Sequence, residues 1–246
     1  MIYTENEISG ELSDFVKCFW MFDSQGEDVL NTILPDGYFD LIFEIRNSEL
    51  FSVFLTGTWT KAIDVHIEKH TRMFGVRFRL IAAEYIFRES IETIVNTSTN
   101  LPVDYWEALQ FDDLAQFEEL ISRILIRFLP EKDEIDNRKF RLFQILYEQK
   151  GDIPVSELAD RIGWSSRQIN RWFNSQFGLS LKTFANILKC HAAYRQIAKG
   201  QLQPAKSYYD QAHFIKEVKR YTGVTPKKLH QNKNDRFLQL STLPKK

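Results

Sequence analysis

VSELADRIGWSSRQINRWF, from Val155 to Phe173, carries the clearest structural pattern in the chain. Up to Ile162, its apolar residues recur at the i, i+3, i+4 and i+7 spacing of an amphipathic helix. Gly163 ends that helix because glycine adopts the left-handed conformation without a Cβ clash. Ser165 or Ser166 then caps a second helix. The stretch therefore predicts two short helices joined by a tight turn, a helix-turn-helix.

The second of these helices has an apolar inner face and a polar outer face. Ile169, Trp172 and Phe173 point inward, so the remaining side chains face solvent. Arg, Asn and Gln carry the paired donors and acceptors that match base edges in the major groove of DNA. The candidate contacts to double-stranded DNA in this helix are Ser166, Arg167, Asn170, Arg171 and Asn174.

Charge is unevenly divided along the chain. The whole chain has 32 Lys and Arg against 33 Asp and Glu. From Arg138 onward there are 21 basic and 7 acidic residues, a net of +14, whereas the first 137 residues have a net of −15. Such a division is typical of a nucleic-acid-binding module joined to another domain, because neutralising phosphates supplies much of the affinity for DNA. Ordinary solvated faces are the alternative explanation of these charges.

Length and cysteine content favour two domains in a reducing, cytoplasmic setting. A chain of 246 residues suits two domains of common size. Cys18 and Cys190 lie in different halves without CxxC spacing, which disfavours a disulfide framework or a cysteine metal site. No apolar run approaches the roughly 18 residues of a membrane span, and Met1 is followed by polar residues rather than a signal peptide. We expect no membrane partner.

The first part of the chain predicts strands, and the second part predicts helices. Pro35-Asp36-Gly37 is a strong turn signal between two strand-like runs. Pro130 to Asn137 is short, charged and turn-like, so it is the best domain boundary. The expected strands are 29–34, 38–45, 50–55, 62–67 and 73–80; the expected helices follow Leu80 and lie near 114–128, 140–147, 181–198 and 209–221.

The second half resembles the AraC/XylS family of bacterial transcription regulators over about Arg138 to Gln231. The carrying strings are LADRIGWSSRQINRWFNSQFG and, more specifically, YYDQAHFIKEVKRYTGVTP from Tyr208 to Pro226. The resemblance implies two helix-turn-helix units bridged by a long helix, each offering a recognition helix to the major groove. It places Arg167, Asn170 and Arg171 at base-facing positions of the first recognition helix. It places Gln211 and Lys216 at those positions of the second.

Phosphate contacts and inward-facing rings complete this interpretation of the second half. His213 is expected to be structural, and Trp164 and Trp172 are expected to belong to the core. The candidate phosphate contacts are Lys182, Lys189, Lys219, Arg220, Lys227 and Lys228, with solvated surface as the alternative for each.

One departure from the family concerns the second unit. Members usually have a full helix before the second recognition helix. Here only Gly200 to Ser207, with Pro204 inside it, separates the long bridging helix from Tyr208. Proline leaves little room for a helix in so short a link. We therefore expect a shortened second unit, whose entry into a groove is in question.

The first half more weakly resembles a β-rich domain that precedes some AraC-type DNA-binding domains. The carrying strings are ILPDGYFDLIF (Ile33 to Phe43) and FGVRFR (Phe74 to Arg79). The resemblance implies a cupin-like, partly open barrel for sensing or dimerisation, so a small-molecule effector and a homodimer are possible partners. The polar residues in these strings, Asp36, Asp40, Arg77 and Arg79, are candidates for a ligand role. As the alternative, turn chemistry explains Asp36 well, and strand-face solvation explains the two arginines.

Cupin-like folds also bind metals, which directs attention to His66 and His70. Their spacing of four suits one side of a helix, and a third ligand cannot be assigned among Glu44, Asp64 and Glu68. Surface histidines near a turn are the commoner explanation. The chain has no nucleophile elbow, P-loop, dinucleotide-binding or zinc-protease motif. We expect neither a cofactor nor an enzyme.

The sequence thus predicts an α+β, two-domain, sequence-specific transcription regulator. The expected division is a β-rich sensing or dimerisation domain with trailing helices at 1–130, a linker at 131–137, an AraC-type helix-turn-helix domain at 138–232 and a tail at 233–246. One alternative is an interaction protein whose degenerate DNA-binding domain docks an acidic partner. The other is a metal-dependent cupin-type enzyme fused to a DNA-binding domain.

Overall fold

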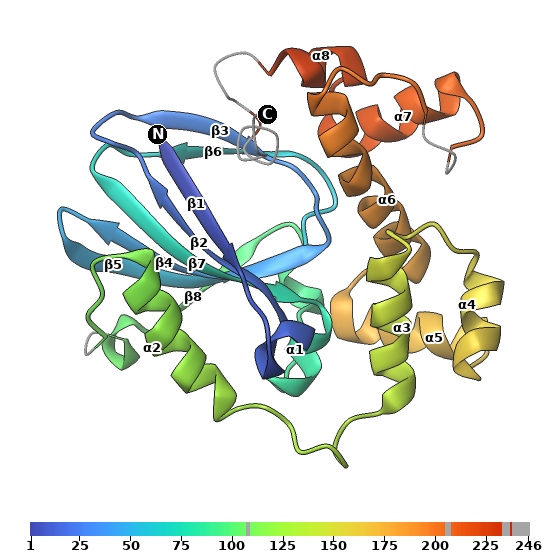
Figure 1. Cartoon of the computed structure of the whole chain (residues 1–246), viewed down its shortest axis with the longest axis horizontal. Helices are drawn as coiled ribbons and strands as arrows, with labels where there is room; N and C mark the ends of the chain where they lie inside the picture. The colour runs from blue at the N-terminus through green and yellow to red at the C-terminus, as the bar shows by residue number, and fades with distance from the viewer. Residues whose placement is uncertain (107–108, 205–207, 233–236, 238–246) are drawn as a thin grey trace. The chain divides into compact units, whose positions relative to one another are not determined.

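The computed structural model describes residues 1–106, 109–204, 208–232 and 237 (Figure 1). They divide into two compact units. Unit 1 consists of Met1–Val29, Tyr38–Thr58 and Ile67–Asn137, and unit 2 consists of Leu30–Gly37, Trp59–His66 and Arg138–Lys246. Two short segments of the first half therefore belong to the unit that holds the helix-turn-helix.

Unit 1 is built on a six-stranded antiparallel sheet with the order β1-β2-β7-β4-β5-β8. The strands are β1 (Ile2–Glu7), β2 (Val16–Asp23), β4 (Tyr38–Arg46), β5 (Glu49–Thr56), β7 (Thr71–Arg79) and β8 (Ser98–Leu101). Short helical segments lie between the strands, namely α1 (Ile81–Tyr85) and the 3-10 turns Glu11–Asp14 and Glu92–Ile94, and a third 3-10 turn, Val103–Tyr105, follows β8.

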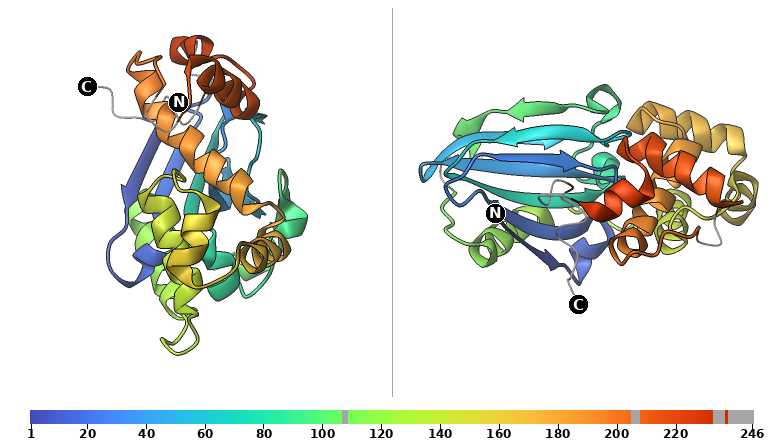
Figure 2. Two further views of the ribbon diagram at one scale, coloured as in Figure 1. Left: turned by 90° about the vertical axis from the view of Figure 1, so that its right-hand side faces the viewer. Right: turned by 90° about the horizontal axis from the view of Figure 1, so that it is seen from above.

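Helix α2 (Leu114–Ile126) lies against this sheet (Figures 1 and 2). Aromatic side chains form the core between them. Phe117 of α2 is fully buried, and its ring centroid lies 6.0 Å from Phe19, 5.4 Å from Phe43 and 5.5 Å from Phe74. These residues alternate along their strands with side chains of the opposite face, as strand geometry requires. Burial of the phenylalanines therefore fixes the face against which α2 packs.

The first part of the chain is β-rich, as expected, and its described strands form open sheets that do not close into a barrel. β1 and β8 are the edges of the six-stranded sheet, and each pairs with one neighbour only. β3 (Val29–Ile33) and β6 (Ile63–Ile67) form a separate two-stranded sheet. The expected strands appear as β3 to β7, whereas the sequence interpretation missed β1, β2 and β8.

Unit 2 is mainly helical. Its helices are α3 (Asn137–Glu148), α4 (Val155–Ile162), α5 (Ser166–Phe177), α6 (Leu181–Ala198), α7 (Gln211–Thr222) and α8 (Pro226–Gln231). None of the helices in the described part of the chain is long and apolar enough to cross a membrane.

The turn at 34–37 is part of the core of unit 2. The hydroxyl of Tyr194, a residue of α6 that is only 1% exposed, donates a hydrogen bond to the Pro35 carbonyl at 2.9 Å. The Tyr147 hydroxyl donates to the Gly37 carbonyl at 3.1 Å. Gly37 has φ +84°, and a Cβ there would lie 2.6 Å from Cδ2 of Leu188. The position therefore requires glycine both for its backbone conformation and for its close approach to α6.

Candidate nucleic-acid interface

The helix-turn-helix predicted around Gly163 is present as α4, a turn and α5. Gly163 has φ 72°, and its N–H donates to the Ala159 carbonyl at 3.0 Å, which ends α4. Ser165 is the N-cap of α5, and its hydroxyl accepts from the Gln168 N–H at 3.2 Å. The Gln168 side-chain oxygen in turn accepts from the Ser165 N–H at 3.0 Å, which completes a capping box. Gln168 is thus used to start the helix.

Aromatic packing holds α5 in place. Ile169, Phe173 and Phe177 on its inner face are fully buried. The Phe173 ring lies 5.8 Å from that of Phe143 in α3 and 5.3 Å from that of Phe184 in α6. Side chains interlocked in this way leave the helix little freedom to rotate. The direction of its outer face is therefore set by the core.

The outer face of α5 brings the predicted contacts together. Arg167, Arg171 and Asn174 are exposed and follow the i, i+4, i+7 spacing, so they form one stripe. Asn170 lies beside them, half-buried, with its Nδ2 donating to the Ser166 carbonyl at 2.9 Å. Ser166 is the first residue of the helix and is also half-buried.

Trp164 in the turn before α5 and Trp172 within α5 are only half-buried, so the expectation that they are core residues is met in part. The rings of Trp164 and Trp172 meet edge to face, 5.8 Å apart. The Arg138 guanidinium carbon lies 4.8 Å from the centre of the Trp164 ring, and the Lys139 ammonium lies 5.0 Å from the centre of the Trp172 ring. Cation–π contacts of this kind contribute roughly 0.5–1 kcal/mol each at exposed sites. The sequence interpretation did not single out Arg138 and Lys139.

The second recognition helix predicted by the resemblance is α7. Its N-cap Asp210 accepts from the His213 N–H at 2.7 Å, and Gly223 ends it with φ 74°. Phe214 and Val218 are buried, as expected for core residues. The predicted contacts Lys216 and Lys219 are exposed on the opposite side.

Two polar side chains of the first turn of α7 bend back toward the preceding loop. Gln211 is half-buried, and its Nε2 donates to the Leu202 carbonyl at 2.9 Å. Its Oε1 is buried and has no hydrogen-bond partner within the described part of the chain. The Nδ1 of His213 accepts from the Tyr209 N–H at 3.5 Å. In this conformation the Gln211 amide faces the protein.

The segment before α7 bears out the departure from the family wherever the structure describes it. Residues 199–204 and 208–210 contain no helix, and the last three residues of the Gly200–Ser207 link lie outside the described residues. Gly200 has φ +77°, and proline at 204 lacks the N–H that a continuing helix would use. The second unit therefore has no regular first helix in the part of the link that is described.

The remaining phosphate candidates differ in their surroundings. Lys189 is engaged by the Asp152 carboxylate at 3.0 Å, and Arg220 lies 3.9 Å from that of Glu217. The other three are exposed on α6 and α8, namely Lys182, Lys227 and Lys228.

The polar residues of the first half that the sequence offered as ligand contacts lie among protein groups. Asp40 Oδ1 accepts from Trp20 Nε1 at 2.8 Å and from Arg77 Nε at 3.1 Å. Arg79 Nε donates to the Ser13 carbonyl at 3.1 Å. Asp36 is buried in the 34–37 turn of unit 2. These contacts give Asp40, Arg77 and Arg79 structural roles.

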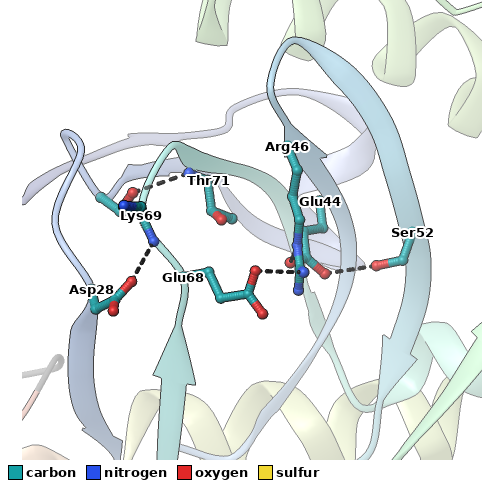
Figure 3. Close-up of polar contacts among 8 residues, drawn as sticks. Asp28, Glu44, Arg46, Ser52, Glu68, Lys69 and Thr71 are labelled. Carbon is teal, nitrogen blue, oxygen red and sulfur yellow. Dashed lines mark hydrogen bonds and ion pairs between the residues drawn. The ribbon is translucent and has the colours of Figure 1, made fainter.

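The carboxylates offered as metal ligands also have protein partners. Figure 3 shows Glu44 between Arg46 and Ser52, with Arg46 Nε at 2.7 Å and Ser52 Oγ at 2.8 Å. Arg46 also reaches Glu68, with Nη1 at 2.9 Å from Oε2. Within the described ranges no three His, Cys, Asp or Glu side chains are placed to hold a metal ion, and His66 and His70 are exposed.

Comparison with known proteins identifies two domains. Residues 158–232 match the family described as a helix-turn-helix domain, and residues 9–100 match a domain of unknown function, DUF6597. No curated protein matches the chain.

Solved structures of ToxT from Vibrio cholerae are similar at a low level. One, bound to (E)-4-(8-methylnaphthalen-1-yl)but-3-enoic acid, has a TM-score of 0.46 and 10% identity and covers 97% of this chain and 99% of its own. Another, at 1.65 Å resolution, has a TM-score of 0.44 and 9% identity and covers 92% and 97%. Likenesses at this level say nothing about function.

The match over residues 158–232 includes most of α4 and all of α5 to α8, the elements that carry the capped turn, the exposed stripe of α5 and the exposed lysines of α7. The same part of the chain holds the excess of basic residues. Residues 158–232 are therefore a helix-turn-helix domain, and the chain is a DNA-binding transcription regulator with a β-rich first half.

Proposed function

We propose that α5 is the helix that reads base edges in the major groove. The observation that carries the proposal is the stripe of Arg167, Arg171 and Asn174, exposed on a helix whose inner face is locked by Phe173 and Phe177. A base-reading side chain must be able to reach the groove while its backbone stays fixed. If the helix moved, its side chains could not distinguish one base pair from another by geometry. The α5 helix meets both conditions.

Each residue of the stripe has a role that follows from its chemistry. Arg167 and Arg171 offer planar donor pairs that match O6 and N7 of guanine, and Asn174 offers a donor and an acceptor that match adenine. Ser166 lies in the first turn, where its hydroxyl and the helix N-terminus suit a phosphate. Asn170 retains its amide oxygen while its nitrogen bonds the Ser166 carbonyl. Each well-formed pair of hydrogen bonds between a side chain and a base contributes roughly 1–3 kcal/mol of discrimination against the wrong base.

The experiment that tests the proposal is selection of bound duplexes from a random DNA pool, at near-physiological salt with non-specific competitor. We expect one enriched motif. Arg171→Ala should then weaken binding to that motif by roughly 1–3 kcal/mol and relax the preference at one position. Arg123→Ala is the matched control, because Arg123 is an exposed arginine of α2 in unit 1 that pairs with Glu119. It should change neither quantity.

Two outcomes count against the proposal. Binding that yields no motif and vanishes with added salt would mean that the basic surface is only electrostatic, which favours an interaction protein that docks an acidic partner. An Arg171→Ala protein that selects the same motif with the same affinity would remove Arg171 from the reading set.

We further propose that the β-rich part receives a small-molecule signal or forms a homodimer, in a cytoplasmic protein without enzymatic activity. The resemblance of Ile33–Phe43 and Phe74–Arg79 to domains that precede AraC-type modules supports this. The proposed division is a β-rich domain at 1–130, a linker at 131–137, a helix-turn-helix domain at 138–232 and a tail at 233–246. Within the tail, 233–236 and 238–246 lie outside the described residues.

A further inference from the structure

The two recognition helices share one geometry and differ in chemistry. The α5 and α7 helices each have 12 residues, a capping side chain that accepts from the third helical N–H, and a left-handed glycine at the end. The outward stripe of α7 that has the spacing of 167, 171 and 174 is 212, 216 and 219, and all three of its residues are exposed. On α5 this stripe is Arg, Arg and Asn, whereas on α7 it is Ala, Lys and Lys.

That difference determines what each helix recognises. Guanidinium and amide groups are planar and make paired hydrogen bonds, so they distinguish one base pair from another. A lysine ammonium is a compact charge on a flexible stem, which suits a phosphate. Ala212 offers no polar group. Two of the three stripe positions on α7 therefore attract the DNA backbone, and the third has no hydrogen bond to give.

The polar side chains that remain in the first turn of α7 are directed elsewhere. The Gln211 amide nitrogen bonds the Leu202 carbonyl, and the His213 imidazole accepts from the Tyr209 N–H. Turning Gln211 toward a base would break the first of these contacts and leave the Leu202 carbonyl to find another donor. The loop before α7 therefore keeps the side-chain amide of Gln211, which the resemblance places at a base-facing position, turned away from the DNA.

A second contact group lies at the start of α7. Tyr209 is 94% exposed, whereas Tyr208 is 7% exposed and packs on Phe214 with ring centroids 4.9 Å apart. The burial of Tyr208 therefore presents the next side chain to solvent, immediately before the N-cap Asp210. The Asp210 carboxylate accepts a hydrogen bond from the His213 N–H at 2.7 Å. The phenolic hydroxyl is a donor of the kind that contacts phosphate oxygens.

We propose that α7 anchors the protein on DNA without reading its sequence, through Lys216, Lys219 and the Tyr209 hydroxyl bound to backbone phosphates. The inference rests on the proposed function of α5, which alone reads bases. Discrimination between operators then comes from one helix, and α7 adds the same affinity to every duplex. The shortened link before α7 fits this role, because a backbone anchor needs no exact depth in the groove.

The lysine part is tested by the salt dependence of binding to two duplexes, the selected motif and a version altered at the Arg171-dependent position. Lys216→Gln and Lys219→Gln should each weaken binding to both duplexes by the same factor. Each should also lower the slope of log affinity against log salt by about 0.9. The matched control is Lys132→Gln, an exposed lysine of unit 1, which should leave the slope unchanged.

The tyrosine part is tested by Tyr209→Phe, which removes only the hydroxyl. Affinity should fall at least about tenfold for both duplexes, the effect of one lost hydrogen bond to a charged acceptor. Tyr105→Phe is the control, because Tyr105 is 78% exposed in unit 1. Both positions lie on the surface, so circular dichroism should show unchanged folding.

The outcomes separate this inference from the function of α5. A changed motif in any α7 variant would show that α7 reads bases, and unchanged affinity in all three would show that it does not touch DNA; either result overturns the inference. If the wild-type protein selects no motif but the α7 variants still lose affinity uniformly, the anchor stands and the reading by α5 fails. If the wild-type protein binds no DNA, both fail.

Discussion

Replacing Gly75 by alanine should destabilise unit 1 through a single rigid neighbour. Gly75 in β7 is directly opposite Trp20 in β2. A Cβ at position 75 would lie 2.1 Å from Cε2, 2.3 Å from Cζ2 and 2.6 Å from Nε1 of the Trp20 indole. Ordinary contact begins near 3.4 Å, so the ring must move by more than about 1 Å. The indole is buried and cannot bend away as a flexible chain would.

The displaced indole also loses its hydrogen bond. Trp20 Nε1 lies 2.8 Å from Asp40 Oδ1, which already accepts from Arg77 Nε at 3.1 Å. Overpacking costs roughly 1–3 kcal/mol, and a buried polar group left without its partner costs roughly 1–3 kcal/mol more. We therefore expect Gly75→Ala to lower the free energy of unfolding of unit 1 by on the order of 3 kcal/mol.

Hydrogen exchange of the β2 and β7 amides, followed by mass spectrometry, reports on unit 1 by itself. A double-mutant cycle with Trp20→Ala isolates the clash, because removing the indole removes the obstacle. In that background Gly75→Ala should cost less than about 1 kcal/mol. A cost below about 1 kcal/mol in the wild-type background, or the same cost in both backgrounds, would refute the steric argument.

Three further predictions concern buried groups. Tyr194→Phe should lower the free energy of unfolding of unit 2 by roughly 1–2 kcal/mol, measured by urea titration, because the Pro35 carbonyl loses its donor; an unchanged midpoint would contradict this. Burial raises the pKa of the Cys18 and Cys190 thiols from 9.0 to about 12, so iodoacetamide at pH 8 should label neither in the folded protein and both in urea. Since these folded-state pKa values are raised, the stability from the protonated thiols is present below pH 9 and lost as pH rises toward 12, which urea titrations at pH 8 and 11 would detect.

Local patterns in the sequence were sufficient to predict the helix-turn-helix. Gly163 and the serines that follow it set the end of one helix and the start of the next within a few residues, so no distant contact is needed. The capping role of Gln168 was missed, although the Ser165-x-x-Gln168 spacing is itself a signature of a capping box. The inward direction of Gln211 depends on the Leu202 carbonyl nine residues away, which no local pattern reveals.

The arrangement of the β-rich half depends on contacts between distant residues and was predicted less well. β2 reads VKCFWMFD, and five of its eight residues are buried, so it lacks the strict alternation of a half-buried strand. Whether a sheet closes into a barrel is decided by its edge strands, and β1 and β8 were both missed. The bond between Tyr194 and Pro35 spans 159 residues. Periodicity cannot show that a turn near residue 35 belongs with helices far along the chain.

The position of the 34–37 turn in unit 2 determines what happens when a protease cleaves the chain between residues 137 and 138. The chain passes between the two units at 29/30, 37/38, 58/59, 66/67 and 137/138. A protease that cleaves at 137/138 severs only one of these five passages, and the Tyr147 and Tyr194 hydroxyls still hold the Gly37 and Pro35 carbonyls. The nicked halves should therefore stay together as a non-covalent complex. A fragment that begins at Arg138 would instead leave a hollow beside Leu188 where Gly37 packs.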